Sequence, residues 1–444
     1  MLLLFNTLYS TFLASRRTSS LLVMGIVCSF LLPSGIHAQN IMIENGRVWT
    51  GSNFEERIIY ISQGRFVDQE PDWIDVTIDA QEKFLVPPFG DYHTHIFDGE
   101  YAQVADSIFL SKGIFFSQDL VNDPVGRKRN ESFLKRSETV DIAFANGCLT
   151  SDFGHPIEGY ERMALGINWP RTDGQRDSIR NSRLMEGRTY HIVNRASDLP
   201  EVMNRLLSSQ PNLIKVILWN SIEYTESADF PVANKGLDPS LIPAILEYGN
   251  RYNLPVVAHV HTEDDFRIAM DKGLRYFAHA PLYGYGVNGQ VSADYPRLSG
   301  ETRDLLEQKE VVVNPTLYRT FKNIQFLPDA RKLTEEQQRW IKDFHRQLLT
   351  DLKDSGAAIV AGADSPGLDG VDEVIYYQHL GVFSPSELLK MLIQTSTYIF
   401  PDRKIGRIAE GYEANLLLLD KNPLENIENA TSIKLHIKGG EIFY

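Results

Sequence analysis

Eight short apolar runs recur through the middle of the chain and alternate with amphipathic stretches. Each run is nearly continuous in apolar character and rich in β-branched or aromatic residues, which is typical of parallel strands covered on both faces. The runs are Phe84–Asp91, Gly113–Asp119, Ile142–Leu149, Leu213–Trp219, Pro255–His261, Tyr276–Ala280, Val311–Leu317 and Ala357–Ala363. Helical patterns separate several of them, at Leu241–Tyr252, Glu263–Lys272 and Glu335–Lys353. Eight strands separated by helices predict the α/β class and a (β/α)8 TIM barrel over residues 86–404.

The two ends of the chain have a different character, with short strands joined by tight turns. Strand-like runs occur at Ile41–Trp49, Ile58–Ile61, Arg65–Asp68 and Val76–Asp79, and again at Asn415–Asp420 and Ile433–Lys438. Asn45-Gly46 and Gln63-Gly64 are turn signals of the kind that join hairpin strands. We therefore predict a small β-sandwich domain built from both termini, residues 39–85 plus 405–444. Residues 150–210 fit neither pattern and are interpreted as a long connection.

The first 38 residues are predicted to be a signal peptide rather than part of the fold. They contain no Asp or Glu, and Arg16 and Arg17 precede an apolar run from Leu21 to Leu32. This run is shorter than the ~20 residues needed to span a bilayer. The expected location is secreted or periplasmic, with an uncleaved membrane anchor as the alternative. After cleavage we expect no stable membrane insertion.

Charge and cysteine content exclude several classes of function. The chain has 44 Lys and Arg against 58 Asp and Glu, a net charge of −14. Binding to nucleic-acid phosphates needs a surplus of basic residues, so no nucleic-acid partner is expected. The two cysteines, Cys28 and Cys148, provide neither a disulfide framework nor a cysteine-based zinc site. The expected partner is a small-molecule substrate, and an oligomer remains possible.

Side chains that can bind a metal stand at the ends of several predicted strands. His93 and His95 share one face of the first strand because side chains alternate along a strand, so both imidazoles can converge on one ion. Active sites of such barrels gather at the carboxyl ends of the strands. Neutral imidazole suits zinc and similar transition metals. Later strands end in further candidate ligands, namely His259 and His261, His279, and Asp364.

Lys215 lies inside the apolar fourth strand, where an ammonium group is costly to bury. Burial lowers the pKa of a lysine and yields a neutral, nucleophilic amine. Such an amine can add CO₂ to form a carbamate that would bridge two metal ions. The alternative is a lysine whose ammonium group reaches the rim of the barrel.

Several stretches resemble the amidohydrolase superfamily. Val86-Pro-Pro-Phe-Gly-Asp-Tyr-His-Thr-His95 is similar to its first-strand signature, and Gly406–Leu416 to its return into the β domain. Within the superfamily the chain is most similar to the imidazolonepropionase-like group that includes prolidase-type dipeptidases. The stretches that carry this are Asn212–Ile217, Val257–His261, Gly273–His279, Asn314–Leu317 and Gly147–His155.

The resemblance implies a set of metal ligands and a function. His93, His95 and Asp364 would bind one divalent ion, His259 and His279 a second, and a carboxylated Lys215 would bridge them. Zinc is the expected metal, at one or two sites. His261 would touch the substrate or support a ligand, although His259 and His261 could exchange these roles. His155 matches a histidine that approaches the substrate in the dipeptidase group.

The predicted reaction is hydrolysis of an amide or peptide-like C–N bond by metal-activated hydroxide, with Asp364 as the proton shuttle. His155 or His261 would stabilise the developing oxyanion. Two alternatives stay open: a hydrolase of lactones or other cyclic esters on the same site, and a non-hydrolytic metal-binding protein. A substrate carboxylate could bind one of five arginines, Arg162, Arg171, Arg176, Arg188 or Arg319.

Overall fold

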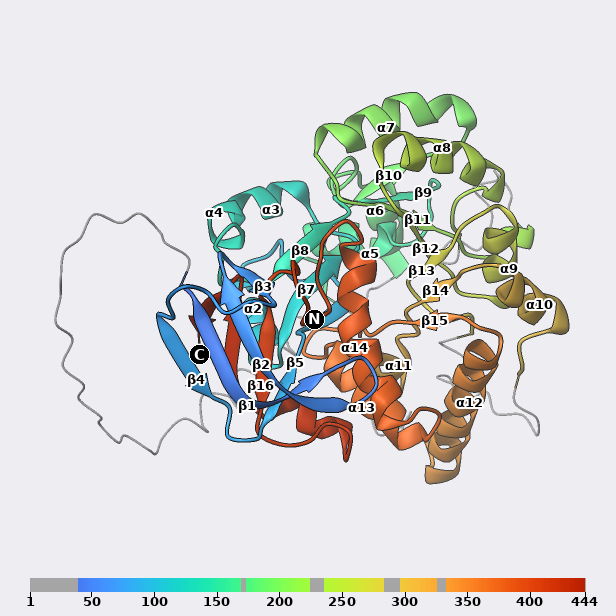
Figure 1. The fold of residues 1–444 in the computed structure, drawn as a ribbon. Coiled ribbons are helices and arrows are strands. Elements are labelled where there is room, and N and C mark those ends of the chain that lie inside the picture. Colours follow the sequence, from blue (N-terminus) through green and yellow to red (C-terminus); the bar gives the residue numbers. More distant parts are fainter. Residues whose placement is uncertain (1–38, 169–172, 224–234, 283–295, 326–332, 444) are drawn as a thin grey trace.

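Parallel strands carry the central part of the chain in the computed structural model, which describes residues 39–168, 173–223, 235–282, 296–325 and 333–443. A seven-stranded parallel sheet has the order β10-β9-β11-β12-β13-β14-β15, and a three-stranded parallel sheet has the order β6-β7-β8 (Figure 1). The strands are β6 (Phe89–Thr94), β7 (Ile114–Asp119), β8 (Asp141–Phe144), β9 (Cys148–Thr150), β10 (Tyr190–Ile192), β11 (Ile214–Ile217), β12 (Val256–His259), β13 (Tyr276–Phe277), β14 (Val312–Val313) and β15 (Ala358–Ile359). The predicted α/β class is confirmed.

Backbone hydrogen bonds connect these two sheets at two places. Beyond β15, the N–H of Tyr92 donates to the carbonyl of Ala361 (2.8 Å), and the N–H of Asp364 donates to the carbonyl of His93 (2.9 Å). At the second place, the N–H of Asn212, just before β11, donates to the carbonyl of Phe144 at the end of β8 (2.7 Å). The carboxyl ends of β6 and β15 are therefore neighbours in space, although they lie far apart in the sequence.

Two of the predicted strands are each divided in two. The run Phe84–Asp91 is interrupted by Pro87-Pro88, which have no N–H to donate to a sheet, so β5 (Phe84–Val86) and β6 join different sheets. The run Ile142–Leu149 is interrupted at Asn146 and Gly147, whose φ angles are 56° and 101°. Two successive residues with positive φ break the regular strand here, and β8 and β9 join different sheets.

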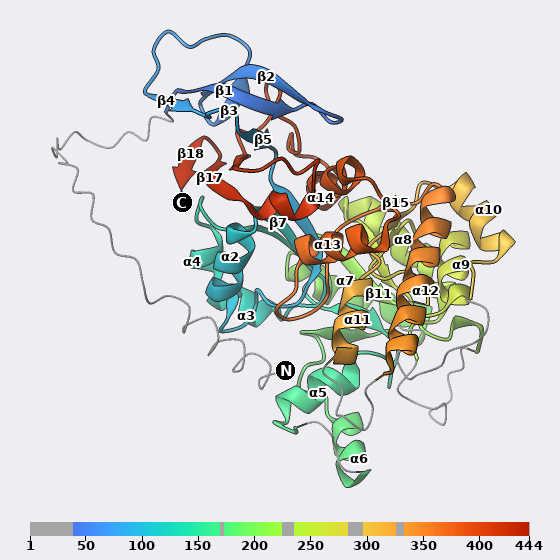
Figure 2. The ribbon, with the colours of Figure 1, turned by 90° about the horizontal axis from the view of Figure 1, so that it is seen from below.

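The interpretation of residues 150–210 as a long connection is wrong for most of the segment. It contains α5, α6, β10 and α7, with α5 and α6 at the end of the molecule opposite to β1–β4 (Figure 2). In α7, the buried residues Leu199, Val202, Met203 and Leu206 follow helical spacing. That periodicity was present in the sequence and was a sufficient signal for this helix.

Helices cover the parallel strands. They are α2 (Ala102–Ser111), α3 (Pro124–Arg129), α4 (Glu131–Leu134), α5 (Ile157–Ala164), α6 (Asp173–Asn181), α7 (Leu199–Ser208), α8 (Ile242–Tyr252), α9 (Glu263–Asp271), α10 (Gly300–Gln308), α11 (Leu317–Gln325), α12 (Glu335–Asp354), α13 (Gly370–Leu380) and α14 (Pro385–Ile399). The predicted helices at α8, α9 and α12 are confirmed. Thr262 and Thr334 start α9 and α12 with capping boxes, which satisfy backbone N–H groups of the first turn.

Strands from both chain ends form one eight-stranded sheet in the described residues, with the path β18-β17-β16-β5-β1-β2-β3 and β4 paired to β1. The remaining bounds are β1 (Ile41–Trp49), β2 (Phe54–Ser62), β3 (Arg65–Val67), β4 (Val76–Asp79), β16 (Leu416–Leu419), β17 (Ile433–Lys438) and β18 (Glu441–Phe443). Figure 2 shows β1–β4 as a layer beside β17 and β18, with β5 between them. The two layers enclose a small apolar core.

Strand β16 is buried on both faces because it separates two cores. Leu416 and Leu418 pack into the small core between the two layers. Leu417 and Leu419 point the other way and belong to the large core of the parallel sheets. A strand with this position must be apolar at every residue, which explains the run of four leucines.

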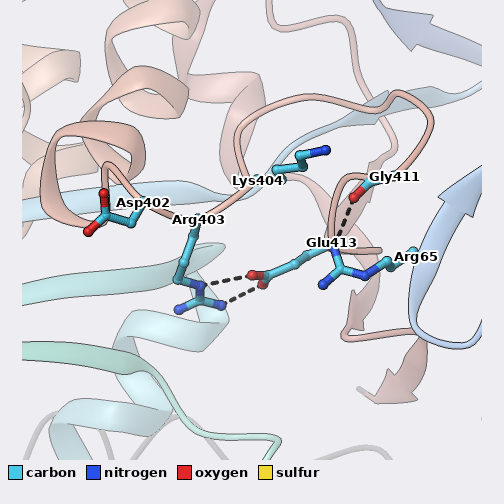
Figure 3. A pocket seen from close by; sticks show the side chains of 6 residues that line it. All are labelled: Arg65, Asp402, Arg403, Lys404, Gly411 and Glu413. Atoms are coloured by element: carbon cyan, nitrogen blue, oxygen red, sulfur yellow. Dashed lines mark hydrogen bonds and ion pairs between the residues drawn. The ribbon is translucent and has the colours of Figure 1, made fainter.

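Arg403 ties the segment after α14 to β8 and to the loop before β16. Its guanidinium forms two hydrogen bonds with the Glu413 carboxylate, at 2.9 and 2.5 Å (Figure 3). A third hydrogen bond goes to Asp141, at 2.7 Å. It also lies over the rings of Phe116 and Phe400. The adjoining pocket of about 500 Å³ is lined by Arg65, Asp402, Arg403, Lys404, Gly411 and Glu413.

The predicted signal peptide falls on residues outside those that the structure describes. Within the described ranges, no helix combines the length and the apolar character that crossing a membrane requires.

We expect Arg403→Met to lower the free energy of unfolding by about 2 kcal/mol, because Glu413 loses its charged donor while the stem over the two rings is kept. Urea unfolding measures the change. Arg65→Met is the matched control, since exposed Arg65 lines the same pocket and donates to the carbonyl of Gly411. Its effect should stay within about 0.5 kcal/mol. Equal losses in both variants would contradict the role given to Arg403.

A buried histidine on α12 makes folding sensitive to acid. His345 is fully buried, and its Nδ1 lies 2.9 Å from the Tyr376 hydroxyl on α13. Burial lowers the pKa of His345 to about 3. The unfolded chain, with an ordinary histidine pKa near 6.5, therefore takes up the proton first. This stabilisation is complete above pH 6.5 and is lost as the pH falls toward 3.

We expect His345→Gln to flatten the pH dependence of unfolding by about 1.4 kcal/mol per pH unit between pH 6 and 4. Urea unfolding at stepped pH values gives this slope, which is independent of any constant loss of stability. His379→Gln is the control, because that side chain is 60% exposed. Parallel curves for wild type and His345→Gln would rule out the effect.

Candidate active site

Two histidines and an aspartate meet where β6 and the end of the β15 segment come together. The Nε2 atoms of His93 and His95 lie 3.1 Å apart. The Asp364 Oδ1 atom lies 3.5 Å from Nε2 of His93 and 3.1 Å from Nε2 of His95. Asp364 has a φ of 48°, a strained conformation that turns its carboxylate toward the two imidazoles. These nitrogens and this oxygen face a common centre.

His279 completes this group from the segment after β13. Its Nε2 lies 3.7 Å from Oδ2 of Asp364, and its ring centroid is 4.9 Å from that of His93. His93, His279 and Asp364 each offer one potential ligand atom, and these atoms all lie within 4.8 Å of one another. All three side chains are buried.

The outer nitrogens of two of these rings are held by hydrogen bonds. Nδ1 of His93 lies 2.9 Å from the carbonyl of Ala278, and Nδ1 of His279 lies 2.7 Å from Oγ1 of Thr316. The Ala278 carbonyl can only accept, so Nδ1 of His93 carries the proton. The Thr316 hydroxyl donates to the Pro315 carbonyl and can accept from Nδ1 of His279. Both Nε2 atoms then present lone pairs to the centre.

His259, at the end of β12, stands beside this group, and Trp219 is a neighbour of both His259 and His261. The ring of His259 is 4.6 Å from that of His279 and 4.9 Å from that of His155, on which it stacks. The ring of His261 instead stacks on Trp219 at 4.2 Å. His155 also contacts Trp219, at 5.3 Å. The predicted residues His155, His259 and His261 therefore line one side of the same site.

Lys215 lies in β11 and is buried among these side chains. It pairs in register with Cys148 of β9 and with Val257 of β12. Its Nζ has no hydrogen-bond partner in the part of the chain that the structure describes. Burial lowers the pKa of Lys215 to about 7. A large fraction of this amine is therefore neutral near pH 7, which is the form that can react as a nucleophile.

The pKa values of the site residues favour neutral histidines and an ionised Asp364. Burial lowers the pKa values of His93, His259 and His279 well below the ordinary histidine value, and that of His155 to about 3. Burial alone would raise the pKa of Asp364. The Arg319 guanidinium and the imidazoles of His93 and His95 outweigh it and hold that pKa well below its ordinary value.

The segment after β14 supports the site through residues to which the sequence analysis gave no role. Thr316 positions His279, and the side-chain amide of Asn314 donates to the carbonyls of Val360 and Gly362. The buried carboxylate of Glu373 accepts the N–H groups of Leu317 and Tyr318, at 2.6 and 2.9 Å, and so caps the start of α11. No signal near Glu373 in the sequence points to α11, because the contact joins separate elements.

The five candidate arginines occupy different surroundings. Arg319 forms an ion pair with Asp364, so it lies at the site, and its side chain is 36% exposed. Arg188 pairs with Asp123, and Arg162 donates to the carbonyl of Ile167. Arg176 lies on α6, and Arg171 lies outside the described residues.

The donor set fits a divalent transition metal. Imidazoles kept neutral by burial and an ionised carboxylate are the forms that bind such an ion, and the outer ring nitrogens of His93 and His279 are already fixed. A buried amine without a hydrogen-bond partner, as at Lys215 Nζ, is costly unless another group satisfies it. Carboxylation of the amine, with a metal beside it, would remove that cost.

Sequence comparison finds a relative for part of the chain. No protein-family model matches. Ochratoxinase from Aspergillus niger is 26% identical over 216 residues, which cover 46% of this chain and 41% of ochratoxinase. The chain thus matches less than half of the length of this curated relative.

Solved structures match over nearly the whole chain. An amidohydrolase superposes with a TM-score of 0.67 and 20% identity, covering 91% of this chain and 98% of that one. Ochratoxinase of A. niger superposes with a TM-score of 0.67 and 18% identity, covering 92% of this chain and 96% of that one. A Xaa-Pro dipeptidase with methionine bound in its active site superposes with a TM-score of 0.67 and 14% identity, covering 91% of this chain and 99% of that one. The resemblance to the amidohydrolase superfamily is therefore confirmed at the level of the fold, which this chain shares with these proteins.

Proposed function

We propose that this protein is a metal-dependent amidohydrolase that cleaves an amide or peptide-like C–N bond of a small molecule. The observation that carries the proposal is the convergence of His93, His279 and Asp364, whose potential ligand atoms lie within 4.8 Å of one another in a buried site. A non-hydrolytic metal-binding protein would use the same ionised carboxylate, so measured turnover separates the two functions.

We also propose that the two parallel sheets form one closed (β/α)8 barrel over residues 86–404, with residues 39–85 and 405–444 as the second domain. Closure is supported by the backbone hydrogen bonds that join β6 to the β15 segment and the end of β8 to the residue two before β11. Closure would bring the ends of β6, β11, β12 and β13 and the end of the β15 segment to one rim, where the candidate ligands stand.

His93, His95 and Asp364 would hold one divalent ion, most simply zinc. His259 and His279 would hold a second, and a carboxylated Lys215 would bridge the two. The lowered pKa of Lys215, about 7, favours the neutral amine that carboxylation requires. The choice of His259 over His261 as ligand is supported by ring contacts, because His259 adjoins His279 while His261 stacks on Trp219.

A bound divalent ion would supply a Lewis acid that polarises the scissile carbonyl and lowers the pKa of water. Asp364, kept ionised, would accept the proton from the attacking water and return it to the leaving nitrogen. His155 and His261 lie on the side of His259 and could donate a hydrogen bond to the carbonyl oxygen as negative charge develops there. The buried surroundings strengthen each of these interactions.

Arg319 is the arginine best placed to bind a carboxylate of the substrate. Its guanidinium reaches Asp364 and is partly open to solvent. A planar guanidinium can hold a carboxylate through two hydrogen bonds, which would fix the substrate beside the reacting centre. The capping of α11 by Glu373 would keep this side chain in place.

Metal analysis followed by a substrate panel tests the proposal. Protein purified without chelator should contain one or two zinc-like ions per chain and should hydrolyse a dipeptide or an N-acyl amino acid. Chelation should abolish turnover and zinc should restore it.

Asp364→Asn should reduce kcat by at least about 100-fold because the general acid–base group is lost, while His379→Asn should match wild type. Absence of bound transition metal would overturn the proposal, and turnover of lactones alone would replace its substrate class.

We expect Arg319→Met to lower kcat/KM for an N-acyl amino acid by about 10- to 100-fold, the loss of a charge-assisted pair. Hydrolysis of the matching carboxamide, which lacks the charge, should fall much less. Arg188→Met is the control, because Arg188 is paired with Asp123 away from Asp364. An equal loss for the acid and the carboxamide would show that Arg319 does not recognise the carboxylate.

A further inference from the structure

His95 is held differently from its neighbours in the ligand cluster. Its Nε2 faces Asp364 and His93, as a ligand would. Its side chain is 30% exposed, whereas those of His93 and His279 are 2% and 3% exposed. Its Nδ1 is buried, yet this atom has no hydrogen-bond partner within the described ranges. A ring with one free outer nitrogen and partial exposure needs another contact to fix its orientation.

Asp119 supplies the facing group. It is the last residue of β7, it pairs with Thr94 in the register of β6, and it is fully buried. Its Oδ2 accepts the N–H of Phe97 at 3.1 Å. Its Oδ1 is buried and, in the part of the chain described, also has no hydrogen-bond partner. This atom lies 3.8 Å from Nδ1 of His95.

The two unsatisfied atoms are complementary. An imidazole with its lone pair on Nε2 carries a proton on Nδ1, and a carboxylate oxygen can accept it. The separation is about 0.9 Å longer than an N–H···O hydrogen bond, a gap that a small rotation of the ring can close. Among the described residues, His95 is the one basic side chain within ion-pair distance of Asp119. A fully buried carboxylate with no other cation beside it is otherwise costly.

We propose that Asp119 is a positioning residue that accepts a hydrogen bond from Nδ1 of His95 and so holds Nε2 of that ring toward the ligand cluster. The inference rests on the proposed metal centre. The sequence analysis gave no role to the end of β7, because its candidate ligands come from other strands. Nδ1 of His93 and His279 is held by a carbonyl and a hydroxyl, and Asp119 would do the same for His95 with a carboxyl oxygen.

Asp119→Asn separates this role from the hydrogen bond to Phe97. The amide oxygen can still accept the N–H of Phe97, but the amide then presents its NH₂ to Nδ1 of His95, a donor against a donor. Asp106→Asn is the matched control: Asp106 is also buried and accepts a backbone N–H, that of Val140 at 2.7 Å, but it lies on α2 away from the cluster. Both variants of the full chain are stripped of metal and titrated with zinc against a competing chelator, and thermal unfolding is recorded.

We expect zinc to bind Asp119→Asn about 10- to 100-fold more weakly than wild type, the usual effect of removing a partner of a ligating histidine. Asp106→Asn should keep wild-type affinity even where it lowers the Tm. Zinc affinity of Asp119→Asn within twofold of wild type would overturn the inference. Failure of wild type to bind zinc would instead overturn the proposed function.

A second measurement needs no Asp119 variant. Nitrogen NMR of the histidine rings in the zinc-loaded wild-type protein reports the tautomer of each ring, and His95→Gln identifies the His95 signals. The expected state has the proton on Nδ1 and the metal on Nε2. Coordination through Nδ1, or a proton on Nε2, would overturn the role of Asp119.

Discussion

Asp364 serves both the site, through its carboxylate, and the contact between β6 and the β15 segment, through its backbone. Its backbone N–H donates to the carbonyl of His93, so it helps to join the β15 segment to β6. Its side chain meets His93, His95, His279 and Arg319. Burial would drive a lone carboxyl toward its neutral form. Here the surrounding cation and imidazoles keep it ionised, which makes it the fixed negative charge in a cluster of neutral bases.

Burial also prepares the other groups for chemistry. The same desolvation that keeps the histidines neutral near pH 7 lowers the pKa of Lys215, so lone pairs rather than protons face the centre. The free-energy cost of burying so many polar atoms is offset by hydrogen bonds at the outer ring nitrogens. Ala278 and Thr316 hold His93 and His279. Asp119 would complete this supporting shell on the side of His95.

The remaining structure holds these strand ends in register. Gly90 lies where α14 packs on β6, and a Cβ there would come within 2.5 Å of the backbone nitrogen of Ser396. Strand β16 joins the small core to the large one, because its leucines alternate between them. Arg403 links the segment beyond α14 to Glu413 and Asp141 by ion pairs. The β-rich ends of the chain therefore brace the parallel strands rather than form an independent appendage.

The sequence by itself determined the α/β class, most strand positions and the identity of the histidines, Lys215 and Asp364 that come together. These follow from local patterns, since apolar runs and helical spacing depend on near neighbours along the chain. The divisions at Pro87-Pro88 and Asn146-Gly147 also had local causes that a closer reading of the backbone preferences would detect. Only the tertiary structure placed His259 beside His279 and His261 against Trp219, put Arg319 next to Asp364, and brought Thr316 and Glu373 to their partners and Asp119 near His95. Those outcomes depend on distances between residues far apart in the sequence, which packing sets and local patterns do not contain.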